Sequence, residues 1–155
     1  MAIWFDKEVS PALVNEVFRG TLPEFLQMEC TEVGEDFMKM KMPVTSRTLQ
    51  PLGILHGGAS CALAETIGSV SSHLAIDRNQ YFSAGLEINA NHIRTVKDGE
   101  VTATCVPLHL GRNTHVWDIR ITDTEDRLVC VCRLTVAIIS LKKAPGNVIS
   151  KEKGK

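Results

Sequence analysis

The segment GILHGGASCALAETIGSVSSHLAI, residues 53–76, decides the fold. It contains no proline, and almost all of its residues are small or apolar. The two glycines followed by a proline-free run predict a helix from about residue 59 to residue 76. Because its residues are small on every side, we expect the helix to be enclosed rather than to lie on a surface. Glu65 is the only Asp, Glu, Lys or Arg in this segment.

The rest of the chain is mostly strand-like. FMKMKMPV, residues 37–44, alternates methionine with lysine, which indicates a strand with one buried face. Further strand patterns occupy residues 81–96, 100–110, 114–123 and 128–140, and the short turns between the later ones favour an antiparallel meander of three or four strands. SPALVNEVFRG, residues 10–20, predicts a short helix with Ser10 as N-cap and Gly20 as its stop.

These elements predict an α+β fold in which a curved antiparallel sheet surrounds one long helix. A small sheet of this kind leaves a strand edge open, and pairing with a second copy would bury it. We therefore expect a homodimer.

Composition excludes several classes of function. The formal net charge of the 155 residues is −1 and aromatic residues make up 5%, which argues against binding of nucleic acid or an anionic membrane. The chain has no uninterrupted run of about 18 apolar residues, so we expect no membrane span. The first ten residues do not resemble a signal peptide. The five cysteines include no CxxC pair, so we expect reduced thiols in a cytoplasmic protein. Cys130 and Cys132 share a strand face, where two core thiols are a better interpretation than a metal ligand pair or a disulfide.

Glu65 requires an explanation, because an unpaired buried carboxylate is costly. It is either a structural residue satisfied by its neighbours or a catalytic carboxylate whose pKa is raised by dry surroundings. Ser69 lies four residues further on, on the same helix face, where its hydroxyl could bond the carboxylate or orient a water molecule. It could equally bond its own main chain.

His56, Gly57 and Gly58 precede the predicted helix, where backbone N–H groups lack partners and the helix dipole is positive. This arrangement could bind an oxyanion or a polarised carbonyl. The same residues are equally compatible with an ordinary glycine-rich turn capped by a histidine. Gly57 and Glu65 are eight residues apart, which is about 12 Å along a helix. If both act on one substrate, we expect them to come from different chains.

Three stretches, QPLGILHGGASCALAETIGS, GLEINANHIR and PLHLGRNTHVW, resemble the hotdog-fold acyl-CoA thioesterases. They are most like the 1,4-dihydroxy-2-naphthoyl-CoA thioesterases of menaquinone synthesis and the related PaaI-like 4-hydroxybenzoyl-CoA thioesterases. The resemblance implies one hotdog domain, over residues 1–141, and a homodimer paired into a homotetramer. It also implies hydrolysis of a CoA thioester without a metal or other cofactor, coenzyme A being part of the substrate. Residues 142–155 are basic and poor in apolar residues, which predicts a flexible tail and departs from the family.

The resemblance also assigns roles to residues. Glu65 would be the nucleophile or the general base, with Ser69 supporting the water. His56 and the Gly57 N–H would hold the thioester oxygen, and Gln50 would position substrate or water. Contacts to coenzyme A would come from seven further residues: Gly85, His92, Arg94, His109, Gly111, Arg112 and Asn113.

Two other functions fit the same residues less well. A hotdog dehydratase or hydratase would also use a histidine and a glutamate here, and a non-catalytic CoA-binding protein could keep the fold. The acyl group is not fixed by these motifs.

Overall fold

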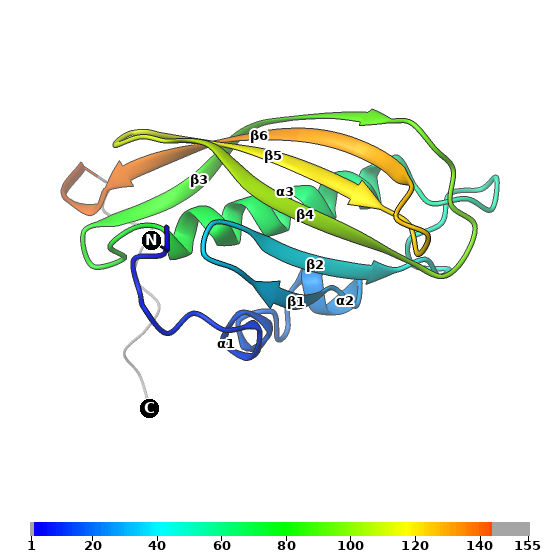
Figure 1. Cartoon of the computed structure of the whole chain (residues 1–155), viewed down its shortest axis with the longest axis horizontal. Helices are drawn as coiled ribbons and strands as arrows, with labels where there is room; N and C mark the ends of the chain where they lie inside the picture. Colours follow the sequence, from blue (N-terminus) through cyan, green and yellow to red (C-terminus); the bar gives the residue numbers. More distant parts are fainter. Residues whose placement is uncertain (1, 144–155) are drawn as a thin grey trace.

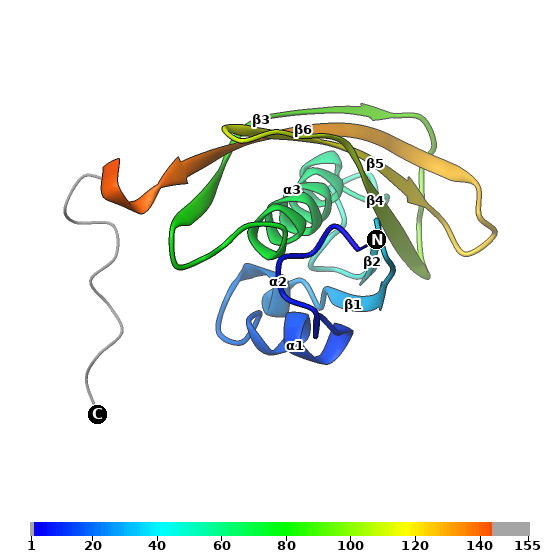
Figure 2. The ribbon, with the colours of Figure 1, turned by 60° about the vertical axis from the view of Figure 1, so that its left-hand side comes forward.

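The computed structural model describes residues 2–143. One six-stranded antiparallel sheet curves around a single long helix, α3 (Gly57–Leu74) (Figures 1 and 2). This confirms the predicted α+β class and the hotdog architecture. No helix in the described part of the chain is long and apolar enough to cross a membrane.

The sheet has the strand order β1-β2-β4-β5-β6-β3. Its strands are β1 (Glu29–Val33), β2 (Met38–Pro43), β3 (Tyr81–His92), β4 (Glu100–Leu110), β5 (Thr114–Thr122) and β6 (Leu128–Ser140). The meander comprises only β4, β5 and β6. The first of the four later strands, β3, pairs with β6 instead of β4 and forms one edge of the sheet. The chain leaving β3 crosses the end of the sheet, where the N–H groups of Ile93 and Arg94 donate to the Val129 carbonyl, and β2 occupies the free side of β4.

The predicted alternation along the strands is confirmed. Met38, Met40 and Met42 on β2 are fully buried. Inward-facing residues of β4 and β5 are also fully buried; these are Val101, Ala103, Cys105, Trp117, Ile119 and Ile121. The Trp117 Nε1–H donates to Ser72 Oγ on α3 over 2.7 Å, so the indole joins the sheet to the helix.

Helix α3 begins at Gly57, two residues before the predicted start, because His56 is the N-cap. Its imidazole Nδ1 accepts a hydrogen bond from the Gly58 N–H at 2.8 Å. The helix ends at Leu74 rather than residue 76.

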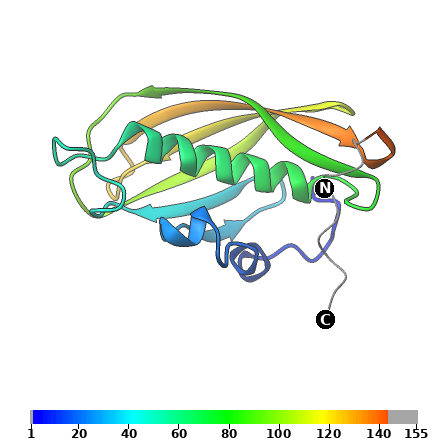
Figure 3. The same ribbon diagram turned by 180° about the vertical axis from the view of Figure 1, so that it is seen from behind.

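The prediction that α3 is enclosed was wrong. One stripe of the helix is half-buried or exposed, comprising Gly58, Cys61, Ala62, Glu65, Thr66, Ser69, Val70 and His73. Figure 3 shows α3 in front of the sheet, with no other element of the described chain crossing it on this side. Small residues are typical of a helix packed closely on more than one side, and a single chain supplies packing for only part of its circumference.

The N-terminal region packs beneath α3 (Figure 2). The predicted first helix is present as α1 (Pro11–Glu16), capped by Ser10, and Gly20 follows in a turn with φ of +70°. The short helix α2 (Leu22–Phe25) and strand β1 were not predicted. The chain described ends in a 3-10 turn, Leu141–Lys143, and the predicted tail otherwise lies outside the described residues.

Candidate active site

Glu65 lies midway along α3, on the stripe that the rest of the chain leaves uncovered. The Ser69 hydroxyl donates to Glu65 Oε1 over 3.1 Å, which is one of the alternatives that the four-residue spacing left open. The carboxylate rests against Gly85 of β3, where a Cβ would lie only 2.2 Å from Oε1. Gly85 precedes a bulge in the pairing of β3 with β6. The half-buried carboxylate therefore has one hydrogen-bonding partner and a closely packed backbone beside it.

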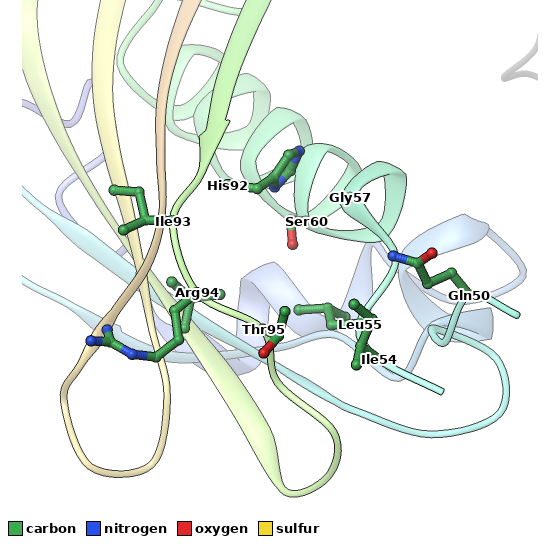
Figure 4. Close-up of a pocket in the computed structure, with 10 residues that line it drawn as sticks. Gln50, Ile54, Leu55, Gly57, Ser60, His92, Ile93, Arg94 and Thr95 are labelled. Atoms are coloured by element: carbon green, nitrogen blue, oxygen red, sulfur yellow. The ribbon is translucent and has the colours of Figure 1, made fainter. Parts of the chain in front are cut away.

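The start of α3 forms a second group of predicted residues. Gln50 and Gly57 line a cavity of about 280 Å³ together with His92 and Arg94 (Figure 4). In Figure 4 the Gln50 amide and the His92 ring point toward the start of α3 from different segments. A Cβ on Gly57 would lie 2.8 Å from His92 Nε2, so the glycine lets the ring approach the backbone closely.

Hydrogen bonds hold Arg94 and His92 in this cavity wall. Arg94 donates through Nη1 to the Leu128 carbonyl at 2.7 Å, which ties its side chain to the start of β6. His92 Nδ1 lies 3.4 Å from the Cys130 Sγ, which is itself 3.5 Å from the Cys132 Sγ. The hydrogen bond between the two thiols lowers the pKa of Cys130 and raises that of Cys132. Both sulfurs are free thiols in the core, as the sequence favoured.

The third group lies around the β4–β5 turn. Gly111 packs against His109, whose Nε2 would overlap a Cβ at that glycine. Arg112 and Asn113 line a cavity with Tyr81 and the end of β6.

One chain therefore separates the predicted coenzyme A residues into distant sets. His92 pairs with Cys130, whereas the Asn113 carbonyl accepts from the Ile138 N–H. Cys130 and Ile138 are eight residues apart on β6, which is about 26 Å of strand. His92 and Arg94 thus lie near one end of the sheet, and Arg112 and Asn113 near the other.

The two candidate catalytic groups are also apart. Gly57 and Glu65 both belong to α3, and their eight-residue separation is about 12 Å of rigid helix. A thioester carbonyl bound at the Gly57 N–H cannot lie within about 3 Å of the Glu65 carboxylate of the same chain.

Sequence reasoning missed several residues that line the cavities. Ser60, which is buried, and Thr95 line the cavity at the start of α3 beside Gln50. The position of Ser60, three residues after Gly57 on the same helix face, was a signal for it. No pattern pointed to Thr95, because it lies in the irregular segment after β3.

A carboxylate and a helix start with backbone donors, carried on one helix within a curved antiparallel sheet, define a protein of the hotdog class. The chain belongs to the thioesterase superfamily, whose family model matches residues 52–130. The predicted class of enzyme, a hydrolase of acyl-CoA thioesters, is confirmed.

Relatives and solved structures agree with this assignment. The chain is 47% identical to the 1,4-dihydroxy-2-naphthoyl-CoA hydrolase of Escherichia coli over 137 residues, covering 88% of this chain and 99% of that protein. It is 44% identical to the proofreading thioesterase EntH of Cronobacter turicensis, covering 88% of this chain and 98% of that protein. The crystal structure of a mutant thioesterase from Pseudomonas aeruginosa superimposes with a TM-score of 0.88 at 40% identity, covering 90% of this chain and all of that one.

Proposed function

We propose that thioester hydrolysis takes place between two chains, with Glu65 from one and the start of α3 from the other. The observation that carries this proposal is the separation of Gly57 and Glu65 on one helix. An antiparallel arrangement of two α3 helices would bring each Glu65 to the other chain's Gly57.

Three features of the chain support pairing with a second copy. β3 is an edge strand, and its free side can continue the sheet into another chain. Leu86, at the β3 bulge, is 64% exposed. The uncovered stripe of α3 lies beside this edge, so one surface offers backbone hydrogen bonds and small side chains to the same partner. The predicted homotetramer would then form from two such dimers.

The chemistry at each shared site follows from the groups present. Because the Gly58 N–H donates to His56 Nδ1, the ring proton is on Nε2. The Gly57 N–H and the His56 Nε2–H of one chain would donate to the thioester oxygen as it becomes negative.

The other chain's Glu65 would then act in one of two ways. As a general base it takes a proton from water, whose oxygen attacks the thioester carbon while the C–S bond breaks and the proton passes to the departing thiolate. As a nucleophile it attacks the carbon directly, the C–S bond breaks and coenzyme A leaves as a thiolate that takes up a proton, and water then hydrolyses the resulting anhydride. The Ser69 hydroxyl supports either route by bonding the carboxylate.

For the substrate we propose an aryl- or acyl-CoA thioester, with 1,4-dihydroxy-2-naphthoyl-CoA as the first to test. Identity of 47% to an enzyme named for that substrate supports this choice and a place in menaquinone synthesis. His92 and Arg94 lie near Gly57, and Arg112 and Asn113 lie at the far end of the sheet, so coenzyme A would be held by both chains. The free cysteines support a reducing, cytoplasmic location.

A complementation experiment tests the shared site. Glu65→Gln and His56→Ala should each abolish most thiol release from acyl-CoA substrates. When the two inactive proteins are unfolded together and refolded, about a quarter of the wild-type activity should return, because half of randomly mixed dimers are hybrids with one intact site. Absence of any recovery in hybrids verified by mass spectrometry would place both groups in one chain.

A further inference from the structure

Two buried thiols lie directly behind the cavity at the start of α3. Cys130 and Cys132 project from the same face of β6, and their sulfurs are 3.5 Å apart. Cys130 Sγ also lies 3.4 Å from Nδ1 of His92, whose ring belongs to the cavity wall beside Gly57. A line of contacts therefore runs from the core through Cys132 and Cys130 to a side chain of the candidate site.

The direction of the hydrogen bonds along this line follows from the acceptors that each thiol has. Within the described residues, the Cys132 thiol has Cys130 Sγ as its only hydrogen-bonding partner, so its S–H donates there. The pKa of Cys130, which this hydrogen bond lowers, agrees with Cys132 as the donor. The Cys130 S–H then has two acceptors in reach, His92 Nδ1 at 3.4 Å and the Val131 carbonyl at 4.0 Å. The shorter distance favours the imidazole, and the hydrogen bond from Cys132 makes Cys130 a better donor to it.

The proton of the neutral His92 ring lies on Nε2 when Nδ1 is an acceptor. Nε2 is the atom that faces Gly57, since a Cβ on that glycine would lie 2.8 Å from it. Among residues 2–143 no acceptor bonds to Nε2, and Figure 4 shows the ring pointing toward the start of α3. The Nε2–H is therefore directed to the place where the Gly57 N–H would hold the thioester.

We propose that Cys130 is a positioning residue for thioester hydrolysis, which holds His92 so that its Nε2–H donates to the thioester sulfur. The inference rests on the proposed function, in which His56 and the Gly57 N–H already donate to the oxygen. The sulfur becomes negative as the C–S bond breaks, so a donor fixed beside it stabilises the transition state more than the bound substrate. The ring keeps its proton in this role, and Cys132 supports Cys130 from the core.

Nitrogen NMR of the ring tests the order of the hydrogen bonds without any substrate. With isotope-labelled histidine at about pH 8, where histidine rings are neutral, the wild-type His92 signals should show one tautomer, protonated on Nε2. His92→Ala identifies these signals by their loss. Cys130→Ala should give a mixture of both tautomers, whereas Cys130→Ser should keep the single one, because its hydroxyl also donates to Nδ1. A wild-type ring protonated on Nδ1, or a ring unchanged in Cys130→Ala, would overturn the inference whatever the activity.

Thiol-release kinetics test the effect of Cys130 on the reaction. Cys130→Ala should lower kcat on the order of tenfold with little change in KM, and Cys130→Ser should recover most of the loss. In a His92→Ala background, Cys130→Ala should cost nothing further. Cys105→Ala is the matched control, since it removes another fully buried thiol, one on β4 that bonds Ser71 rather than His92. It should keep the wild-type kcat.

These kinetics distinguish the positioning role from the proposed function. An equal loss in Cys130→Ala and Cys130→Ser, an equal loss in Cys105→Ala, or a loss that persists in the His92→Ala background would overturn the positioning role and leave the proposed function intact. The wild-type kcat in Cys130→Ala would do the same. Failure of the wild type to release thiol from any acyl-CoA would overturn the proposed function itself.

Discussion

Gly85→Ala is expected to impair catalysis without unfolding the protein. The added methyl group would lie 2.2 Å from Glu65 Oε1 and 3.2 Å from its Cδ. Ordinary van der Waals contact needs about 3.5 Å or more, so the carboxylate must move by roughly 1 Å. It is the end of a flexible side chain and can do so at little cost, and Gly85 is exposed, with no positive φ that an alanine would strain.

The expected loss is in kcat. A misplacement of about 1 Å in a catalytic group can lower the rate on the order of 100-fold. Stability should be unchanged or slightly higher, because alanine restricts the unfolded chain more than glycine does. If the main role of Gly85 is instead to contact coenzyme A, as the family resemblance implies, KM should rise and kcat should change little.

Thiol-release kinetics and thermal unfolding separate these outcomes, and Glu65→Asp provides the control. Aspartate withdraws the carboxylate from Gly85, so adding Gly85→Ala to Glu65→Asp should cost much less than adding it to the wild type. A Gly85→Ala enzyme with wild-type kcat, or one whose loss is the same in both backgrounds, would refute the steric argument.

Three further outcomes follow from the same contacts. Ser69→Ala removes a hydrogen bond to a carboxylate worth about 1.5–3 kcal/mol, so steady-state kinetics should show kcat lower by roughly tenfold or more, and an unchanged kcat would exclude the bond from the mechanism. Gly68→Ala places a Cβ 2.4 Å from Leu134 Cδ2 in the core. Its overpacking cost of about 1–3 kcal/mol exceeds the gain in helix propensity, so the melting temperature should fall, whereas a rise would show that the helix can shift. Burial holds the pKa of His115 below its ordinary value of 6.5, so its contribution to stability is complete above pH 6.5 and is lost as the pH falls through the folded-state pKa. This group should lower the free energy of unfolding below pH 6.5 by at most about 1.4 kcal/mol per pH unit. Denaturant titrations of His115→Gln at several pH values should show a weaker pH dependence than the wild type; the same pH dependence in both proteins would show that another group causes it.

Much of the fold could be predicted because burial in a sheet has a period of two. The methionines of β2 and the alternation along β4 and β5 each identify the inward face from the order of residues alone. The pairing of β3 could not be predicted in the same way. Periodicity identifies which face of a strand is buried, but the choice between β4 and β6 as a neighbour depends on how the connecting segment crosses the sheet.

In the candidate site, too, the contacts between residues close in sequence could be predicted, whereas those between distant segments could not. Ser69 and Glu65 are neighbours through helical spacing alone, and the distance from Gly57 to Glu65 follows from the rise of a helix. Gly85 was expected only as a coenzyme A contact, because its place beside Glu65 depends on how β3 crosses α3. A cavity of about 390 Å³ between α1 and α3 was missed for a stronger reason: its wall joins residues 13–17 to residues 69–83, which lie more than 50 residues further along the chain. Groups fixed by one helix can thus be predicted from the sequence, whereas a cavity between α1 and α3 is created only when these two segments pack together.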